Sequence, residues 1–375
     1  MDRPSFTLGI EEEYLIVDRQ TRDLVAEPDP AYLKACGDIF GDQVSTEFLQ
    51  CQIEVGTRPH RSVGDAIEEL RHLRWGVADA AEPFGYAVIA ASTHPFAQWR
   101  QQSRTKKERY EGLWSDIGGP AWRLLICGMH MHVGIEDPDQ RIDLMNQASY
   151  FLPHMLALSG SSPFWDGTDT RLSSYRLTVF DAMPRTGLPD PLSSYSEYLR
   201  LIEHLVAASC IEDGSKIWWD IRPSSKFPTL EQRITDVCPR LEDVAALAAL
   251  YQSLLSWLYR LRTRNQRWRI YPNTLIAENR WRAQRYGVEG KLIDHGCALA
   301  VPVSDLVEEL LDMLGDDAAA LGCARELHAL RHIVTEGTSA MRQRKVYSHA
   351  IASGAEKPAA LQAVVDSLIE EFTSH

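Results

Sequence analysis

Five segments of this chain alternate apolar residues with carboxylate, imidazole, guanidinium or amide side chains: residues 5–18, 47–57, 124–137, 216–224 and 229–236. Residues that alternate in this way point to opposite faces of a β-strand. An ordinary half-solvated sheet also alternates, but its outer face mixes Lys, Thr, Ser and Glu. Here the polar residues are mostly metal-ligand types, with hardly any lysine. The pattern favours strands with one apolar face and one chemically specialised face.

The first segment, SFTLGIEEEYLIVD, contains three consecutive glutamates. In a strand, Glu11 and Glu13 share one face, whereas Glu12 points the other way with Ile10 and Tyr14. The same alternation separates polar from apolar residues in the other four segments. Their polar-face residues include Gln50, Gln52, Glu54, His130, His132, Asp220, Arg222, Glu231 and Arg233.

If these polar faces converge, their carboxylates need a counter-charge, and divalent cations are the usual one. Several carboxylates with one imidazole suit Mg²⁺ or Mn²⁺ better than structural Zn²⁺. Carboxylate-bound Mg²⁺ typically acts on a phosphate chain, which favours an ATP enzyme. The chain has no Walker A motif, no GxGxxG motif and no kinase signature. A bound nucleotide would therefore be held mainly by metals and arginines.

The composition limits the classes of partner that this protein is expected to bind. The 375 residues are 45% hydrophobic and carry a formal net charge of −13, which argues against nucleic acid or anionic membrane as partners. No apolar run reaches the roughly 18 residues of a membrane span. The start MDRPSF is unlike a signal peptide, and the seven cysteines are scattered without a CxxC pair. We expect a cytoplasmic protein with reduced thiols.

The distribution of strand and helix signals indicates the fold class. The first 60 residues are strand-rich, and strands are also expected at 86–94, 123–135, 216–222 and 229–236. Helices are expected at 62–83 (capped by Ser62), 140–159, 193–209, 241–262 and from about 300 to 375. The charged stretch 98–119 is expected at the surface. The elements lack regular βαβ alternation, which predicts an α+β protein with an antiparallel sheet.

Six motifs, in order, resemble the YbdK-type carboxylate–amine ligases, also called the glutamate–cysteine ligase type 2 family. They are GIEEEY, QCQIEVGTRP, CGMHMHVGI, WWDIRPS, TLEQRITD and ENRWRAQRYG, and the resemblance runs from about residue 6 to 295. GMHMH and LEQR are more distantly similar to glutamine synthetase. The resemblance implies one catalytic domain over 1–375, with a helical part from about 300. It also implies a curved antiparallel β-sheet of the glutamine synthetase/guanido kinase type, with a concave active-site face and helices on the other face.

The same resemblance implies an activity. Such enzymes use ATP and two or three Mg²⁺ or Mn²⁺ ions to join a carboxylate to an amine through an acyl phosphate. Glutamate with L-cysteine, giving γ-glutamylcysteine, ADP and phosphate, is the conventional pair, and another acid or amine remains open.

The resemblance also implies roles for individual residues. Glu231 is expected to bridge metal and phosphate, and Arg233 to stabilise the transferring phosphoryl group. Glu12 is expected to face away, paired behind the sheet. The implied metal ligands are Glu11, Glu13, Glu54, His130 and Glu231. The arginines expected to bind ATP or substrate are Arg58, Arg176 and Arg222, although Arg222 could instead form an internal ion pair with Asp220.

Two alternative functions fit the sequence less well. A metal-dependent amide hydrolase could use the HxH of HMH, but it would need later histidines at strand ends. The later histidines lie in helical or loop-like sequence: His295, His328, His332 and His349. A non-catalytic nucleotide-binding relative is opposed by the presence of every expected carboxylate. A homodimer is expected, with the helix at 241–262 and the Ala-rich tail as candidate interfaces.

Overall fold

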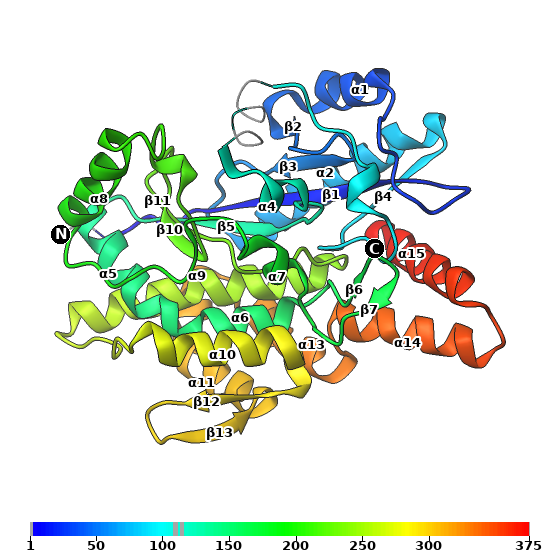
Figure 1. Ribbon diagram of the computed structural model, residues 1–375. Helices are drawn as coiled ribbons and strands as arrows, with labels where there is room; N and C mark the ends of the chain where they lie inside the picture. The colour runs from blue at the N-terminus through cyan, green and yellow to red at the C-terminus, as the bar shows by residue number, and fades with distance from the viewer. Residues whose placement is uncertain (1–2, 108–111, 113–115, 375) are drawn as a thin grey trace.

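A seven-stranded antiparallel sheet forms the centre of the computed structural model, which describes residues 3–107, 112 and 116–374 (Figure 1). The strand order is β10-β11-β5-β1-β3-β2, and β4 pairs with the end of β1 beside β5. The sheet contains β1 (Leu8–Asp18), β2 (Val44–Thr46), β3 (Gln52–Gly56), β4 (Tyr86–Ile89), β5 (Met129–Gly134), β10 (Ile221–Pro223) and β11 (Thr229–Gln232). The α+β class and the antiparallel sheet are confirmed.

The register of this sheet brings the polar faces of all five segments together. Residues directly opposite each other in antiparallel strands point to the same face. The facing pairs are Glu13 with Glu54, Glu11 with His130, His132 with Glu231, and Glu231 with Arg222. The convergence expected from alternation is therefore present, with one functional face built from strands that are far apart in sequence.

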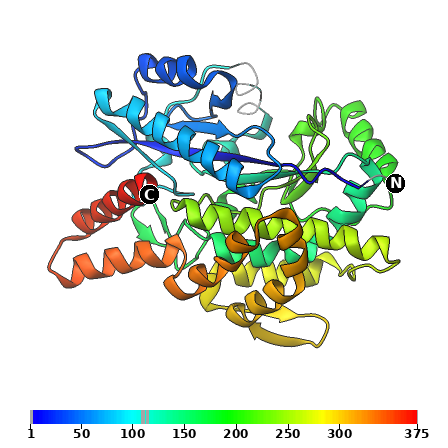
Figure 2. The ribbon, with the colours of Figure 1, turned by 180° about the vertical axis from the view of Figure 1, so that it is seen from behind.

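Two long helices, α2 (Val63–Ala81) and α9 (Leu241–Thr263), cover the other face of the sheet, as the view from behind shows (Figure 2). Helix α2 begins at Ser62, whose Oγ accepts a hydrogen bond from the Asp65 N–H at 3.1 Å. Its buried stripe packs on the sheet. Helix α9 is buried along most of its length, between the sheet and the C-terminal helices.

The remaining elements surround this core. The C-terminal part is helical, as expected, and contains α11 (Val303–Leu321), α12 (Ala324–His328), α13 (Leu330–Glu336), α14 (Ser339–Ala352) and α15 (Lys357–Thr373). Earlier helices are α1 (Pro30–Phe40), α4 (Gly119–Trp122), α5 (Pro138–Ala148), α6 (Leu152–Ser159), α7 (Arg176–Phe180), α8 (Tyr195–Ala207) and α10 (Asn273–Tyr286). Three small sheets pair β6 (Phe164–Trp165) with β7 (Thr168–Asp169), β8 (Thr186–Gly187) with β9 (Trp218–Trp219), and β12 (Lys291–Asp294) with β13 (Leu299–Pro302).

Several sequence-based expectations were wrong in detail. Helix α1 lies within the supposedly strand-rich start, where the Asp29 side chain and Pro30 form a good N-terminus. The helix expected at 140–159 is two helices, because Pro153 cannot donate the backbone bond that a continuous helix needs. The strands expected at 86–94 and 123–135 are shorter than predicted. In the stretch 98–119, residues 108–111 and 113–115 lie outside the described residues.

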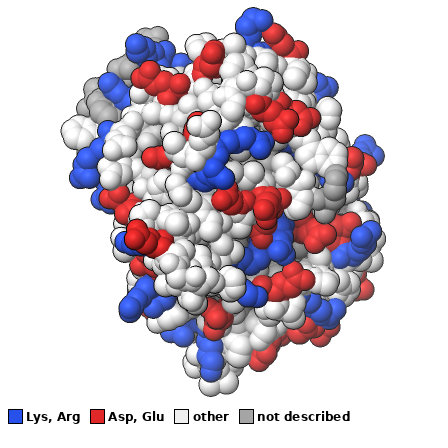
Figure 3. All heavy atoms as spheres, turned by 90° about the vertical axis from the view of Figure 1, so that its right-hand side faces the viewer, with Lys and Arg blue, Asp and Glu red and all other residues white. Residues whose placement is uncertain are grey.

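Charged side chains of both signs are interspersed on the face that carries α14 and α15 (Figure 3). Several form ion pairs between distant segments, including Arg22 with Asp366 and Arg344 with Asp169. In the described part of the chain, no helix combines the length and the apolar character that a bilayer crossing requires.

Gly160, at the end of α6, allows two segments near the functional face to touch. A Cβ at this position would lie 2.1 Å from Ser173 Oγ and 3.1 Å from the Ser173 carbonyl oxygen. We therefore predict that Gly160→Ala lowers the free energy of unfolding by about 1–3 kcal/mol. Gly315→Ala, in the open interior of α11, is the matched control and is expected to raise it by about 0.5–1 kcal/mol. Urea denaturation measures both, and equal effects of the two variants would contradict the close approach.

Candidate functional site

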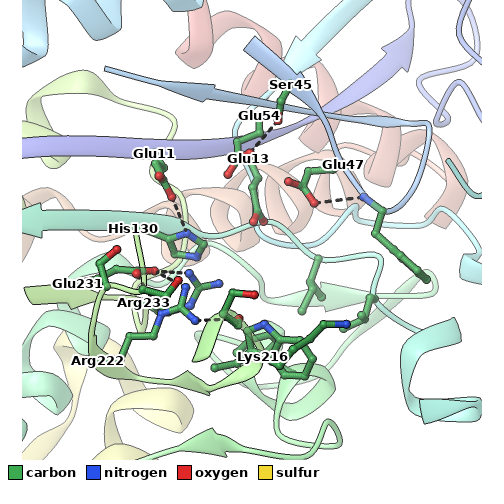
Figure 4. A pocket seen from close by; sticks show the side chains of 18 of the residues that line it. Glu11, Glu13, Ser45, Glu47, Glu54, His130, Lys216, Arg222, Glu231 and Arg233 are labelled. Atoms are coloured by element: carbon green, nitrogen blue, oxygen red, sulfur yellow. Dashed lines mark hydrogen bonds and ion pairs between the residues drawn. The ribbon is translucent and has the colours of Figure 1, made fainter. Parts of the chain in front are cut away.

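A cavity of about 380 Å³ opens on the polar face of the central sheet (Figure 4). One wall carries glutamates from β1, from β3 and from the segment between β2 and β3. The opposite wall carries arginines from β10, α7 and the residues that follow β11, and the two histidines of β5 lie between the walls. The charged and imidazole residues of the cavity are Glu11, Glu13, Glu47, Glu54, Lys107, His130, His132, Arg176, Lys216, Arg222, Lys226, Glu231 and Arg233.

Three carboxylates form a tight cluster at the acidic wall. Glu13, Glu47 and Glu54 each offer an oxygen, and these oxygens all lie within 4.8 Å of one another. The backbone N–H of Gly128 donates to Glu13 at 2.7 Å, and Ser45 Oγ donates to Glu54 at 2.9 Å. These bonds hold the carboxylates in place while leaving further lone pairs available to a cation.

The electrostatics of this cluster are unfavourable without a cation. Burial, together with the charges of Glu11 and Glu13, raises the pKa of Glu54 to about 7. Burial, together with Glu54 and Glu13, also raises the pKa of Glu47 well above its ordinary value. Like charges at this separation cannot all ionise unless a positive charge joins them. The donor set therefore fits a hard divalent cation with oxygen ligands.

Glu11 lies between the two histidines of β5. Its carboxylate oxygens are 3.6 Å from His130 Nδ1 and 3.5 Å from His132 Nε2. Burial alone would raise the pKa of Glu11, but the two adjacent imidazoles outweigh burial and lower that pKa well below its ordinary value. His130 Nε2 is buried and makes no hydrogen bond with the described residues, whereas His132 Nε2 faces the carboxylates of Glu11 and Glu231. Buried, unpartnered imidazole nitrogens beside carboxylates are suited to metal ligation.

The two imidazoles differ in charge preference. Burial, reinforced by Arg233, lowers the pKa of His130, which favours the neutral form that binds metals. Burial would also lower the pKa of His132, but Glu11 and Glu231 outweigh it and raise that pKa. His132 Nδ1 also hydrogen-bonds with Thr229 Oγ1 at 3.0 Å. This difference supports the preference for His130 over His132 as the ligand.

At the basic wall, Glu231 lies between two arginines. Arg222 donates to both Glu231 oxygens, at 3.0 and 3.1 Å, and Arg233 Nη1 donates to Glu231 Oε1. Burial would raise the pKa of Glu231, but Arg233, His132 and Arg222 lower it far below its ordinary value. Glu231 therefore stays ionised at any pH where the protein would work.

The two partners of Glu231 are not equivalent. Arg222 also donates to the carbonyl oxygens of Ser215 and Ile217, so its guanidinium is occupied by protein groups. Arg233 Nε is buried without a hydrogen-bond partner in the described part of the chain, and the residue lines the cavity. Arg233 is thus the better placed of the two to meet an anionic ligand, whereas Arg222 holds Glu231.

Arg176 is buried against the backbone that follows β11. Its Nη1 and Nη2 donate to the Arg233 carbonyl, both at 3.2 Å, and Nη1 also reaches the Ile234 carbonyl at 3.4 Å. Burial lowers the pKa of Arg176. Gly128 makes room for this guanidinium, since a Cβ there would lie 2.4 Å from Nη2. Arg176 lines the cavity, as its predicted role in substrate binding requires.

Two expectations do not match the geometry. Arg58 is exposed and is absent from the cavity lining, so the structure does not bring it to the site. Asp220 pairs with Arg280, at 2.7 and 3.1 Å, rather than with Arg222. Arg280, from the ENRWRAQRYG motif, lies on α10 and also binds Asp181, so it ties segments together behind the cavity.

Several residues that line the cavity were not predicted from the sequence, among them Glu47, Lys216 and Trp218. Glu47 lies just after β2, outside any strand, so strand alternation gave no signal for it. Its position seven residues before Glu54, across a short connection, is the only available hint. Lys216 and Trp218 lie at the start of a predicted strand that is in fact broken into short pieces.

The fold defined by this sheet and its helices is that of known glutamate–cysteine ligases. The solved glutamate–cysteine ligase of Francisella tularensis, in complex with AMP, is similar with a TM-score of 0.70 over 100% of this chain and 90% of that one, at 14% identity. A bifunctional glutathione synthetase from Pasteurella multocida is similar with a TM-score of 0.69 at 16% identity, over 98% of this chain and 52% of that one.

Sequence comparison identifies the family. The model of the glutamate–cysteine ligase family 2 matches residues 7–366, so this chain belongs to that family. A protein of Rhodospirillum rubrum named "Putative glutamate–cysteine ligase 2" is 56% identical over 99% of this chain and 96% of its own length. A protein of the same name from a Jannaschia species is 56% identical over 98% of this chain and 97% of its own.

The raised pKa of Glu54 gives a prediction about pH. Its unfolded-state pKa is near 4.5 and its folded-state pKa about 7, so the folded state binds more protons between these values and its stability falls as pH rises. Glu54→Gln removes this effect. Without divalent cations, we predict that the stability of the variant relative to the native chain rises by about 3 kcal/mol between pH 5 and pH 8.

Urea denaturation with a chelator present measures this difference. Glu242→Gln, at an exposed glutamate of α9, is the control and should show no such pH trend. Excess Mg²⁺ should shrink or reverse the advantage of Glu54→Gln, because the cation stabilises only the ionised cluster. A pH-independent difference between the variant and the native chain would contradict the assignment.

Proposed function

We propose that this chain is an ATP-dependent carboxylate–amine ligase that activates an acid as an acyl phosphate. The observation that supports it most is the single cavity in which a wall of carboxylates faces the Glu231–Arg233 pair. A phosphate chain carries several negative charges and requires both metal ions and guanidinium groups to hold it. We also propose that residues 1–375 act as one catalytic domain.

Two or three Mg²⁺ or Mn²⁺ ions are part of this proposal. When bound, they neutralise the phosphate oxygens and so lower the barrier to phosphoryl transfer. The unpartnered Nε2 of His130 and the raised pKa of Glu54 support their presence. The residues that would hold them are Glu11, Glu13, Glu47, Glu54, His130 and Glu231.

The protein groups have separate tasks in this chemistry. A free carboxylate is a poor acyl donor, and phosphorylation gives it a good leaving group that the amine then displaces. Arg233 is placed to stabilise the charge that develops on the transferring phosphoryl group. Arg222 keeps Glu231 ionised and oriented, and Arg176 holds the backbone carbonyl of Arg233. Arg176 Nε, buried and unpartnered, is available to a substrate carboxylate.

The names of the relatives support glutamate and L-cysteine as substrates, with γ-glutamylcysteine, ADP and phosphate as products. AMP in the Francisella tularensis structure supports a nucleotide site in this fold. Another acid or amine pair is the second candidate, because the cavity carries charges that would suit several amino acids.

The hydrolase alternative is weaker. Only two histidines, both on β5, occur among the described residues that line the cavity, and a metal hydrolase of the expected kind would need more. A non-catalytic relative is also disfavoured, because the carboxylates and Arg233 all face the cavity.

We further propose a cytoplasmic enzyme that forms a homodimer. All seven cysteines are free, as a reducing compartment requires. Most of α9, which was a candidate interface from sequence, is buried within the chain, so apart from Glu242 only its C-terminal end is open to a partner. The tail helices remain a candidate surface, and light scattering of the purified protein tests the dimer.

Phosphate release from ATP tests the proposed function. With Mg²⁺ or Mn²⁺ present, we predict slow release with glutamate or cysteine alone and at least tenfold faster release with both. A panel of other acids and amines identifies the true pair if glutamate and cysteine are not it. Release that is independent of any amine, or cleavage of preformed γ-glutamyl peptides instead, would contradict ligation.

Glu231→Gln provides the matched test of the site. Because Glu231 orients Arg233 and is a proposed ligand, its loss is expected to lower kcat by about 10²–10³-fold. The circular dichroism spectrum should stay native, and Glu242→Gln should keep full activity. Normal turnover by Glu231→Gln would exclude this cavity as the active site.

A further inference from the structure

Behind the functional face, Glu12 of β1 forms a buried ion pair with Arg74 of α2. Arg74 Nε donates to Glu12 Oε2 at 2.9 Å, and Nη2 donates to both Glu12 oxygens at 2.8 Å. Tyr14 Oη donates to the same carboxylate at 2.5 Å. All three side chains are completely buried. The residue between the two predicted metal ligands of β1 is therefore fixed from the opposite face of the sheet, as expected for Glu12.

The same guanidinium also holds a second part of the site. Arg74 Nη1 donates to the Pro239 carbonyl at 2.6 Å, and Nη2 donates to the Cys238 carbonyl at 2.7 Å. These carbonyls belong to the segment 233–240, which follows β11 and begins with Arg233. One side chain thus connects the strand that carries the acidic wall with the segment that carries the catalytic arginine.

The segment 233–240 also makes hydrogen bonds with parts of the chain other than α2. Thr235 exchanges hydrogen bonds with Met129 of β5, and the Asp236 carboxylate accepts from the hydroxyls of Ser162 and Ser174. These contacts set the position of the segment relative to β5 and to the loop after α6. Arg74 adds the contact with Glu12 of β1, and through Glu12 it reaches the neighbours Glu11 and Glu13.

Helix α15 packs against the outer side of this hydrogen-bond network. The Phe372 ring packs edge-to-face on Tyr14, with centroids 4.9 Å apart, and lies 5.4 Å from the Arg74 guanidinium carbon. Glu371 accepts hydrogen bonds from Arg240, at the end of the segment, and from Arg342 of α14. The C-terminal helix therefore excludes water from the Glu12–Arg74 pair, which strengthens its electrostatic interaction.

The network is more elaborate than stability alone requires. A buried ion pair is often no more stabilising than well-packed apolar residues of similar volume. Arginine offers a rigid fork that reaches a carboxylate and two carbonyls at once, whereas lysine offers donors at one point. A requirement for this geometry, rather than for charge or volume, explains the choice of residue.

We propose that Arg74 is a positioning residue for the ligase reaction, which sets the separation between the carboxylates of β1 and Arg233. This inference rests on the proposed function, because it assigns Arg74 a task in metal binding and phosphoryl transfer. Misplacement of about 1 Å between reacting groups can cost about 10²-fold in rate. Arg74 does not touch the cavity, so it acts through Glu12 and through the backbone of residues 238 and 239.

Arg74→Lys tests this proposal, since lysine keeps the charge beside Glu12 but cannot also reach Cys238 and Pro239. We predict about 10–100-fold weaker Mn²⁺ binding, measured by electron paramagnetic resonance, and a similar loss in kcat. Arg260→Lys, at a residue of α9 that pairs with Asp317 and does not line the cavity, is the matched control. It makes the same substitution at an ion pair away from the cavity and should keep native Mn²⁺ affinity and kcat.

A second variant tests the proposal if Arg74→Lys does not fold. Glu12→Leu with Arg74→Met removes both charges, so it leaves no unpaired buried ion, and it should show the same losses with a native circular dichroism spectrum. A folded variant of either kind with native Mn²⁺ affinity and kcat would overturn the proposal. Failure of both variants to fold would also overturn it, because the network would then serve folding alone.

Measurements on the native chain distinguish a failure of this proposal from a failure of the proposed function. If the native chain binds Mn²⁺ but does not couple ATP to ligation, the proposed function fails, while Mn²⁺ affinity still tests the effect of Arg74. If the native chain performs ligation and Arg74→Lys behaves like Arg260→Lys, only the role of Arg74 fails.

Discussion

Mutual repulsion among partly buried carboxylates is the constraint on which the rest of this structure depends. Glu13, Glu47 and Glu54 converge within a few ångströms, and Glu11 lies on the same face. Burial, reinforced by the neighbouring carboxylates, raises the pKa values of two of them, Glu47 and Glu54. A chain that concentrates negative charge in this way stores an unfavourable energy, which a bound cation can relieve. The cluster is therefore best understood as half of a binding site.

The other half is a set of arginines with distinct surroundings. Arg222 is committed to Glu231 and nearby carbonyls, whereas Arg176 donates to the carbonyls after β11 and keeps its Nε without a partner among the described residues. Arg233 retains a buried, unpartnered Nε and faces the cavity. The guanidinium groups thus differ in what they can offer a ligand, although all three carry the same charge. Behind the sheet, contacts of Arg74 and α15 connect the strand that carries the carboxylates with the segment that carries Arg233.

The sequence predicted the functional face well because alternation and register are simple rules. Glu11, Glu13, Glu54, His130 and Glu231 each stand at a polar position of a strand, and antiparallel pairing brings such positions to one face. Residues outside regular strands, such as Glu47, follow no comparable rule. The same limit applies to Arg58, which lies outside the cavity, and to Asp220, which pairs with Arg280 of α10 and not with Arg222. Asp29 and Pro30 at the start of α1 were local signals within a strand-like stretch, and Pro153 was a local signal within an apparently continuous helix.

Transfer of oxygen from the acid to phosphate would test the central claim most directly. The acid substrate is labelled with ¹⁸O in its carboxylate and incubated with ATP, Mg²⁺ and the amine that supports turnover. An acyl-phosphate route places one labelled oxygen in each inorganic phosphate released, because the carboxylate oxygen attacks the γ-phosphorus and leaves with the phosphate. Mass spectrometry of the phosphate reads the outcome. Unlabelled phosphate, or label found in AMP instead, would contradict the account.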